Sequence, residues 1–211
     1  GILGSSENPQ LDIFSNSWAA TPFSFLYQGY VIEELRRMTR FAHKNEIVVI
    51  QARGNAGQNQ SSYPSTFYPG WQAGDDWVIS VGGSTLGGDR IFYSNYGPQT
   101  DVIAPADDTL IYTLGPSADG YANFSGTSAA CPHVSGVAAL LLSHSSSKLA
   151  PEDIEHLIEY GALDKDSVGY DTKTGYGLLH AGNTVRKVLA DCQVMHFEIQ
   201  PSNPTMVLAT T

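Results

Sequence analysis

The chain has 211 residues, enough for one α/β domain, and its 42% hydrophobic and 15% charged residues are typical of a folded protein rather than a disordered one. Its formal net charge of -10 opposes contact with phosphate backbones, so no nucleic acid partner is expected. The longest strongly apolar stretch, near residues 134–142, is too short to span a bilayer, so no membrane helix is expected.

The first part of the chain predicts a strand, a helix and a second strand. Leu11–Phe14 is a short apolar run typical of a buried strand. A helix is expected from Tyr30 on, because apolar residues follow at helical spacing: Val31, Leu35, Met38 and Phe41. Ile47–Ile50 is a continuous β-branched run, which favours a parallel strand covered on both faces.

The second part predicts two further strands, at 77–81 and 101–103, and three helices. Residues 128–143 are rich in Ala, Val and Leu and predict a buried helix with Pro132 in its first turn. Another helix begins at Pro151, and a last one follows Leu178. The expected fold class is α/β.

The pattern changes after Asp191 to alternating apolar residues interrupted by Pro201 and Pro204. We therefore expect a boundary near residue 190. Residues 1–190 would form one domain, and residues 191–211 would be a linker or the start of a downstream module.

The most informative stretch is 124–136, Phe-Ser-Gly-Thr-Ser-Ala-Ala-Cys-Pro-His-Val-Ser-Gly, which resembles the nucleophile motif of the subtilisin-like serine peptidases. The resemblance implies that Ser128 is the nucleophile. Gly126 would allow close approach of a substrate backbone, and the start of a helix offers free N–H groups and a positive dipole end to a developing oxyanion.

A second stretch, 48–57, is similar to the strand end where this family carries the asparagine of its oxyanion hole, here Asn55. A third, 12–19, looks like the extended segment that pairs with substrate backbone. The resemblance implies that the substrate-binding residues are Ser17, Trp18, Ala19, Ala52, Arg53, Gly54 and Thr127. Ala19 and Arg53 stand where the family has smaller residues, which leaves substrate preference open.

The resemblance covers roughly residues 11–190 and implies a three-layer subtilisin-like fold with a mostly parallel sheet, incomplete at its N-terminal side. It also implies a serine endopeptidase that acts on polypeptides and lies outside the cell or in the periplasm. A lipase-type esterase is excluded, because Ala130 stands where that motif requires Gly.

The Asp and His of a serine peptidase triad have no matching motif in residues 1–54, so both are expected upstream of this chain. His133 follows Ser128 by five helical positions, about 140° around the axis, and is expected to be a buried structural residue. The alternative function is a non-catalytic peptide-binding or scaffold module derived from a peptidase.

No cofactor is expected for the chemistry, and no metal ligands are assigned. Residues 164–169 resemble the start of a calcium loop, but Val168 and Gly175 stand where oxygen ligands are needed, which favours an acidic turn over a structural calcium site. Cys131 is expected to pack in an apolar helix rather than react.

Overall fold

The computed structural model describes residues 11–18, 28–60, 77–107, 109, 111–115, 120–145 and 149–191. The central element is a parallel four-stranded sheet in the order β1-β2-β3-β4. Its strands are β1 (Ile13–Asn16), β2 (Val48–Ala52), β3 (Ile79–Ser84) and β4 (Val102–Pro105). The four predicted strands are confirmed, each beginning one or two residues later than expected.

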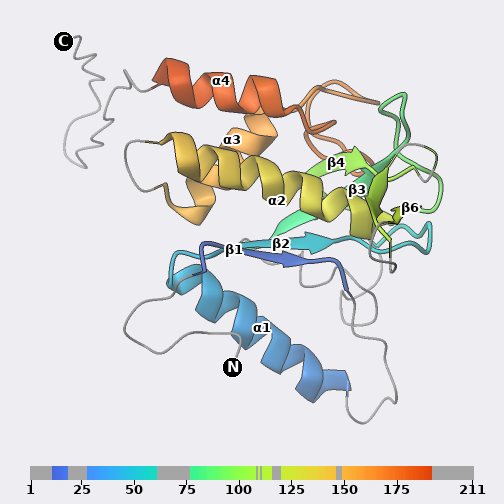
Figure 1. The fold of residues 1–211 in the computed structure, drawn as a ribbon. Coiled ribbons are helices and arrows are strands. Elements are labelled where there is room, and N and C mark those ends of the chain that lie inside the picture. Colours follow the sequence, from blue (N-terminus) through green and yellow to red (C-terminus); the bar gives the residue numbers. More distant parts are fainter. Residues whose placement is uncertain are drawn as a thin grey trace.

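Helices cover both faces of the sheet, which makes three layers (Figure 1). Helix α1 (Gln28–Lys44) lies on one face. Helices α2 (Thr127–His144), α3 (Pro151–Gly161) and α4 (Ala181–Asp191) lie on the other. The predicted α/β class and the subtilisin-like layering are therefore confirmed.

The sheet has a hydrophobic core on each of its two faces, because successive side chains along β2 point to opposite faces. Val48, Ile50 and Ala52 point into the larger core, which they share with α2 and α3. Ile47 and Val49 point to the opposite side, into a smaller core that includes Ala42 of α1. All five residues of β2 are buried, as expected of a parallel strand covered on both faces.

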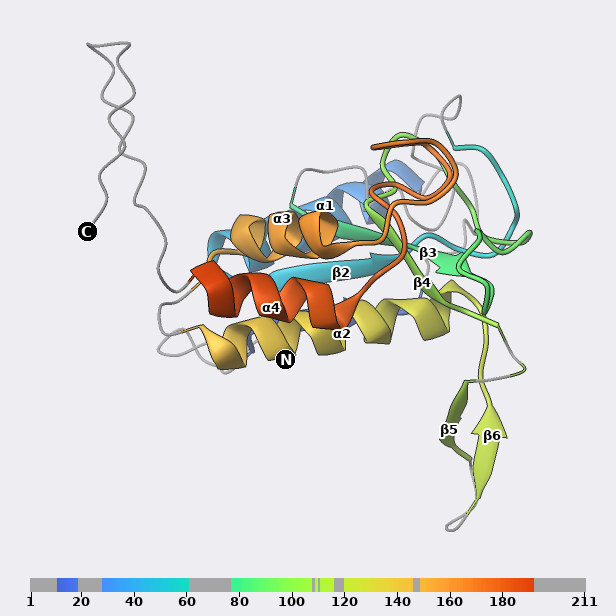
Figure 2. The same cartoon turned by 90° about the horizontal axis from the view of Figure 1, so that it is seen from above.

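A two-stranded antiparallel hairpin was not predicted from the sequence. Its strands are β5 (Tyr112–Leu114) and β6 (Tyr121–Asn123), and Figure 2 shows it projecting from the body of the molecule. Three residues are too few for an alternation pattern to be recognised. The hairpin leads directly into the start of α2, so it lies close to the predicted nucleophile.

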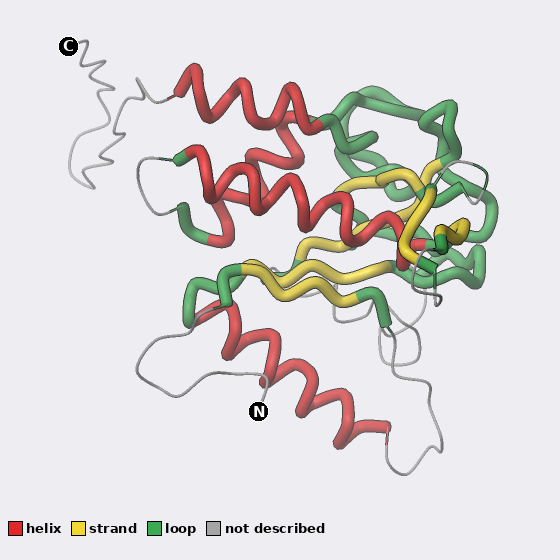
Figure 3. Tube along the Cα trace, in the orientation of Figure 1, coloured by secondary structure: helices red, strands yellow, loops and turns green. Residues whose placement is uncertain are grey.

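Parallel strands bring their carboxyl ends to the same edge of the sheet, and Figure 3 shows the loops that follow them gathered where α2 begins. The loop after β2 carries Asn55, and the start of α2 carries Ser128. The predicted boundary near residue 190 coincides with the end of α4, but residues 192–211 lie outside the described part, so the domain division stays a prediction.

Candidate active site

The loop that carries Asn55 leaves β2 through Gly54, whose φ of 92° is in the region that favours glycine. Asn55 itself is exposed, whereas Gly54 is buried. The chain therefore turns sharply and presents the Asn55 side chain at the carboxyl edge of the sheet.

The start of α2 faces this loop at close range. Gly126 is the residue before the helix and has φ 87° and ψ 170°, a conformation open essentially to glycine alone. A Cβ atom at this position would lie 2.9 Å from Nδ2 of Asn55. Glycine at position 126 therefore lets the amide of Asn55 approach the first turn of α2.

Thr127 fixes the orientation of the Asn55 amide. Its backbone N–H and its hydroxyl both donate to Oδ1 of Asn55, each at 2.9 Å. The same hydroxyl accepts a hydrogen bond from the Gly54 N–H, also at 2.9 Å. Because a backbone N–H can only donate, the atom it contacts must be the amide oxygen, and Nδ2 is left as a donor that Thr127 does not use.

Ser128 and Ser17 hold each other through reciprocal hydrogen bonds. The Ser128 hydroxyl donates to the Ser17 carbonyl, and the Ser17 hydroxyl donates to the Ser128 carbonyl, both at 2.9 Å. The second bond is possible because Pro132, four residues on, has no N–H to take the Ser128 carbonyl. Pro132 is thus the sixth residue of α2 rather than part of its first turn, which corrects the sequence prediction.

The loop after β2 and the start of α2 meet at a corner that carries Asn55 and Ser128. Two hydrogen-bond donors at this corner have no acceptor within the described residues: the backbone N–H of Ser128 and Nδ2 of Asn55. Both belong to the edge where the loop after β2 meets α2, and Ser128 is only half-buried. The corner can therefore accept an oxygen that carries partial negative charge next to a serine hydroxyl.

The remaining predicted substrate-binding residues differ in accessibility. Ser17 is half-buried and Trp18 is 44% exposed, so both can meet a ligand, whereas Ala19 lies outside the described residues. Gly54 is buried, and the side chains of Ala52, Arg53 and Thr127 are buried as well, with exposures of 4%, 1% and 1%.

Arg53 points away from this corner. Its guanidinium donates to the Ser80 hydroxyl at 3.3 Å and to the Gln99 carbonyl at 3.1 Å, and burial lowers its pKa to about 10. The guanidinium of Arg53 therefore binds protein groups, and the role predicted for Arg53 in substrate binding stays a prediction. Thr127 likewise contacts Asn55 and Gly54 rather than open surface.

A residue that the sequence left without a role also supports this corner. The hydroxyl of Tyr93 accepts a hydrogen bond from the Gly126 N–H at 3.0 Å and donates to the Ala106 carbonyl at 2.5 Å. Tyr93 lies within the range 11–190 that resembles the family, but only the fold brings its hydroxyl to Gly126.

Comparison with known proteins identifies the family of this chain. The model of the subtilase family matches residues 3–177. The chain belongs to the subtilase family. It is 28% identical over 190 residues to a probable subtilase-type serine protease of Deinococcus radiodurans, covering 82% of this chain and 24% of that protein.

Other relatives give the same result. The chain is 32% identical to an extracellular basic protease of Dichelobacter nodosus, over 68% of this chain and 24% of that protein. It is 34% identical to a thermophilic serine proteinase of Bacillus sp. strain AK1, over 72% of this chain and 34% of that protein. This subtilase chain thus spans about a quarter to a third of the length of these curated relatives.

A crystal structure of a lanthipeptide protease has the same fold, with a TM-score of 0.69 and 23% identity, over 83% of this chain and 61% of that one. In the part of the subtilase chain that the structure describes, no helix combines the length and the apolar character needed to cross a bilayer.

A catalytic base for Ser128 is absent from its hydrogen-bond partners within the described residues, since the hydroxyl contacts only a carbonyl. His133 is exposed, and its Nδ1 lies 2.7 Å from the Ala129 carbonyl of its own helix. The prediction that His133 is buried is wrong, because the face of α2 that carries it turns away from the sheet. His196 lies outside the described residues.

Cys131 has the packing role expected for it. Its side chain is fully buried, with Sγ 3.6 Å from the Ser15 hydroxyl. Burial raises the pKa of the thiol, which keeps it protonated and weakly nucleophilic.

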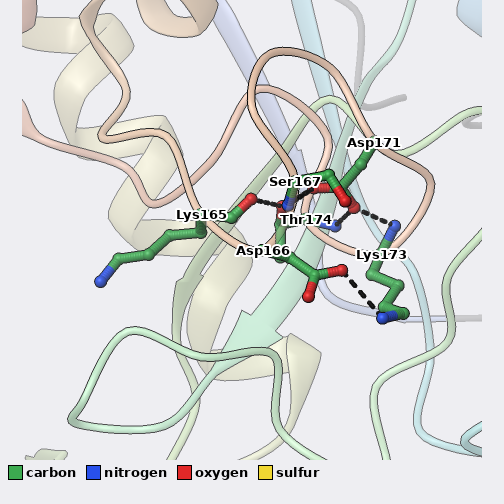
Figure 4. A network of polar contacts seen from close by, with 6 residues as sticks. All are labelled: Lys165, Asp166, Ser167, Asp171, Lys173 and Thr174. Carbon is green, nitrogen blue, oxygen red and sulfur yellow. Dashed lines mark hydrogen bonds and ion pairs between the residues drawn. The ribbon is translucent and has the colours of Figure 1, made fainter.

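The acidic loop between α3 and α4 is held by its own hydrogen bonds (Figure 4). The Asp171 carboxylate accepts from the backbone N–H groups of Lys173 and Thr174 at 2.7 and 3.0 Å, and from the Thr174 hydroxyl at 2.7 Å. Lys173 also pairs with Asp166 at 2.8 Å. These carboxylates accept hydrogen bonds from donors of the same loop, and the preference for an acidic turn over a calcium site stays a prediction.

Within the described residues, three carboxylates lie close enough to share a metal ion: Asp101, Glu155 and Glu159 have ligand atoms within 4.8 Å of one another. Burial, and then the charge of Glu155, raise the pKa of Asp101 well above its ordinary value. Burial also raises the pKa of Glu159. Both shifts favour the neutral form of the carboxyl concerned.

Proposed function

We propose that the protein containing this chain is a serine endopeptidase that hydrolyses polypeptides through an acyl-enzyme on Ser128. The proposal rests on one arrangement. The Asn55 amide oxygen accepts hydrogen bonds from Thr127, its nitrogen has no acceptor among the described residues, and Ser128 follows Thr127 at the start of an apolar helix.

In the proposed reaction the Ser128 hydroxyl attacks the carbonyl carbon of the scissile peptide bond. The Nδ2 of Asn55 and the Ser128 N–H donate to the oxygen on which negative charge develops. Because both donors are already oriented before substrate binds, little free energy is spent on arranging them in the transition state. For a subtilisin the loss of one such donor is known to lower kcat by roughly 10²- to 10³-fold, and we expect a similar loss for Asn55→Ala.

The base that takes the Ser128 proton, and the carboxylate that orients it, are proposed to come from a segment upstream of Gly1. The serine hydroxyl remains a weak nucleophile without them, so we expect negligible hydrolysis by the 211-residue chain alone. Ser17 and Trp18 are proposed to contact the substrate, and so is Ala19. The chemistry needs no cofactor. An extracellular or periplasmic location is proposed, since one of the relatives is named an extracellular protease.

The decisive experiment is labelling of the complete protein with a fluorophosphonate, which reacts with activated serines. We expect wild type to be labelled and Ser128→Ala to lose both labelling and peptide hydrolysis. Ser135→Ala, on the same helix, is the matched control and should keep both. If wild-type protein is not labelled and cleaves no peptide, the endopeptidase proposal is rejected.

A second candidate is a non-catalytic peptide-binding or scaffold module. The hydrogen bond from the Ser128 hydroxyl to the Ser17 carbonyl favours it, because a backbone carbonyl cannot act as the base that removes the hydroxyl proton. Such a module would bind extended peptides equally well in the wild type and in Ser128→Ala. Titration with a non-cleavable peptide alongside a cleavage assay separates the two candidates.

A further inference from the structure

The loop at residues 53–58 carries the proposed oxyanion donor and lies beyond the end of β2. Its first residue still bonds to the sheet, because the Arg53 N–H donates to the Val81 carbonyl at 2.9 Å. Asn55 is exposed, and among the described residues its side chain is hydrogen-bonded to Thr127 alone. The position of the donor therefore depends on what holds the backbone on each side of Asn55.

A single buried residue, Asn95, makes four hydrogen bonds to this backbone, beside those made by Thr127, Tyr93 and Tyr96. Its Nδ2 donates to the Arg53 carbonyl at 3.0 Å. Its Oδ1 accepts from the N–H groups of Ala56 and Gln58, at 3.1 and 3.0 Å. Its own backbone N–H donates to the Gly54 carbonyl at 3.0 Å.

These four backbone groups lie on both sides of Asn55 along the chain. The side chain of Asn95 is fully buried, with 0% exposure, so water is not available to replace its contacts. Its amide orientation is determined by chemistry: two N–H donors require oxygen on one side, and a carbonyl requires nitrogen on the other.

Both polar atoms of the Asn95 amide bond to this loop, and asparagine supplies the donor and the acceptor that these bonds need. Removing the side chain would leave one carbonyl and two N–H groups without partners next to Asn55, and the loop would rearrange to satisfy them. A shift of about 1 Å at a group that stabilises a transition state is enough to lower a rate by about 10²-fold.

We propose that Asn95 is a positioning residue that fixes the oxyanion donor Asn55 by clamping the backbone on both sides of it. This inference depends on the proposed endopeptidase function for its effect on rate, but not for its effect on the loop.

The test is a double-mutant cycle in the complete protein with a peptide substrate. We expect Asn95→Ala to lower kcat by about 10- to 100-fold, with KM changed by less than about 2-fold, because Asn95 does not touch substrate. In the Asn55→Ala background, the same change should lower kcat by less than about 2-fold, since the donor it positions is gone. An equal loss in both backgrounds would overturn the inference.

Ile158→Val serves as the matched control, because Ile158 is fully buried in α3 and lies in the core rather than on the loop. It should lower the melting temperature and leave kcat unchanged. A fall in kcat that follows the loss of stability in both variants would count against a positioning role for Asn95.

Asn95→Asp covers the case in which Asn95→Ala does not fold. The protonated carboxyl can still donate to the Arg53 carbonyl, whereas the ionised form places negative charge against it. The ratio of kcat in Asn95→Asp to kcat in wild type should therefore fall as pH rises through the pKa of the new carboxyl. A ratio independent of pH would contradict the clamp.

Amide hydrogen exchange decides the structural part independently of activity. In Asn95→Ala, the N–H groups of Ala56 and Gln58 should exchange faster, while those of β3 keep their protection. Unchanged exchange at 56–58 would overturn the inference even in an active enzyme. Absence of hydrolysis by wild type, combined with faster exchange at 56–58, would reject the proposed function and leave the clamp supported.

Discussion

Replacement of Thr127 by valine tests how the oxyanion corner is built. Valine has nearly the same shape, so the change removes one hydroxyl and keeps the backbone N–H that donates to Asn55. The lost hydroxyl accepts from the Gly54 N–H and donates to Oδ1 of Asn55, each at 2.9 Å. Gly54 is buried, so its N–H is left without an acceptor, whereas Oδ1 keeps one donor.

A buried donor without a partner costs about 1–3 kcal/mol, and we expect the free energy of unfolding to fall by that amount. Urea unfolding of the complete protein measures it, in a Ser128→Ala background to prevent self-digestion. The midpoint should decrease with an unchanged slope. In the active protein, kcat should fall, but by less than the roughly 10²- to 10³-fold expected for removing an oxyanion donor altogether.

Thr127→Ser is the control for this prediction. It keeps the hydroxyl and its two hydrogen bonds and loses only a methyl group, so kcat should remain close to wild type. If Thr127→Val unfolds at the same urea concentration as wild type and retains full kcat, the hydroxyl does not hold Gly54 and Asn55 together, and the reasoning fails.

Two further predictions concern Gly126 and Asp171. Gly126→Ala forces a side chain into a backbone conformation of φ 87° and ψ 170°, with its Cβ 2.9 Å from Nδ2 of Asn55. We expect the free energy of unfolding to fall by about 1–3 kcal/mol and kcat to fall as well. An unchanged urea midpoint together with an unchanged kcat would contradict the close approach of Asn55 to Gly126. Burial opposes ionisation of Asp171, but hydrogen bonds from Thr174, Lys173 and Ser167 outweigh it and lower its pKa. The stability that Asp171 contributes is therefore present above the ordinary carboxyl pKa, near 4, and is lost as pH falls through the lower pKa of the folded state. Between about pH 5 and pH 2, the melting temperature of Asp171→Asn should decline less steeply than that of wild type. Parallel plots of melting temperature against pH for the two proteins would refute this prediction.

Much of the fold could be predicted from local patterns. The β-branched run at 47–50 predicted a strand covered on both faces, and β2 is buried along its whole length. The Ala-rich stretch after Ser128 predicted the buried helix α2. These predictions succeeded because periodicity and burial are properties of consecutive residues. The hairpin of β5 and β6 was missed, since three-residue strands are too short to show a period.

The sequence by itself determined which residues meet at the candidate site: motifs with fixed order named Ser128 and Asn55, and the fold brings the loop and the helix start together. Only the tertiary structure decided how the site is held. The amide of Asn55 is oriented by Thr127, 72 residues away, and its loop is clamped by Asn95. The exposure of His133 differed from expectation, because the direction in which a side chain faces depends on segments distant in the chain, and those contacts leave no pattern in the local sequence.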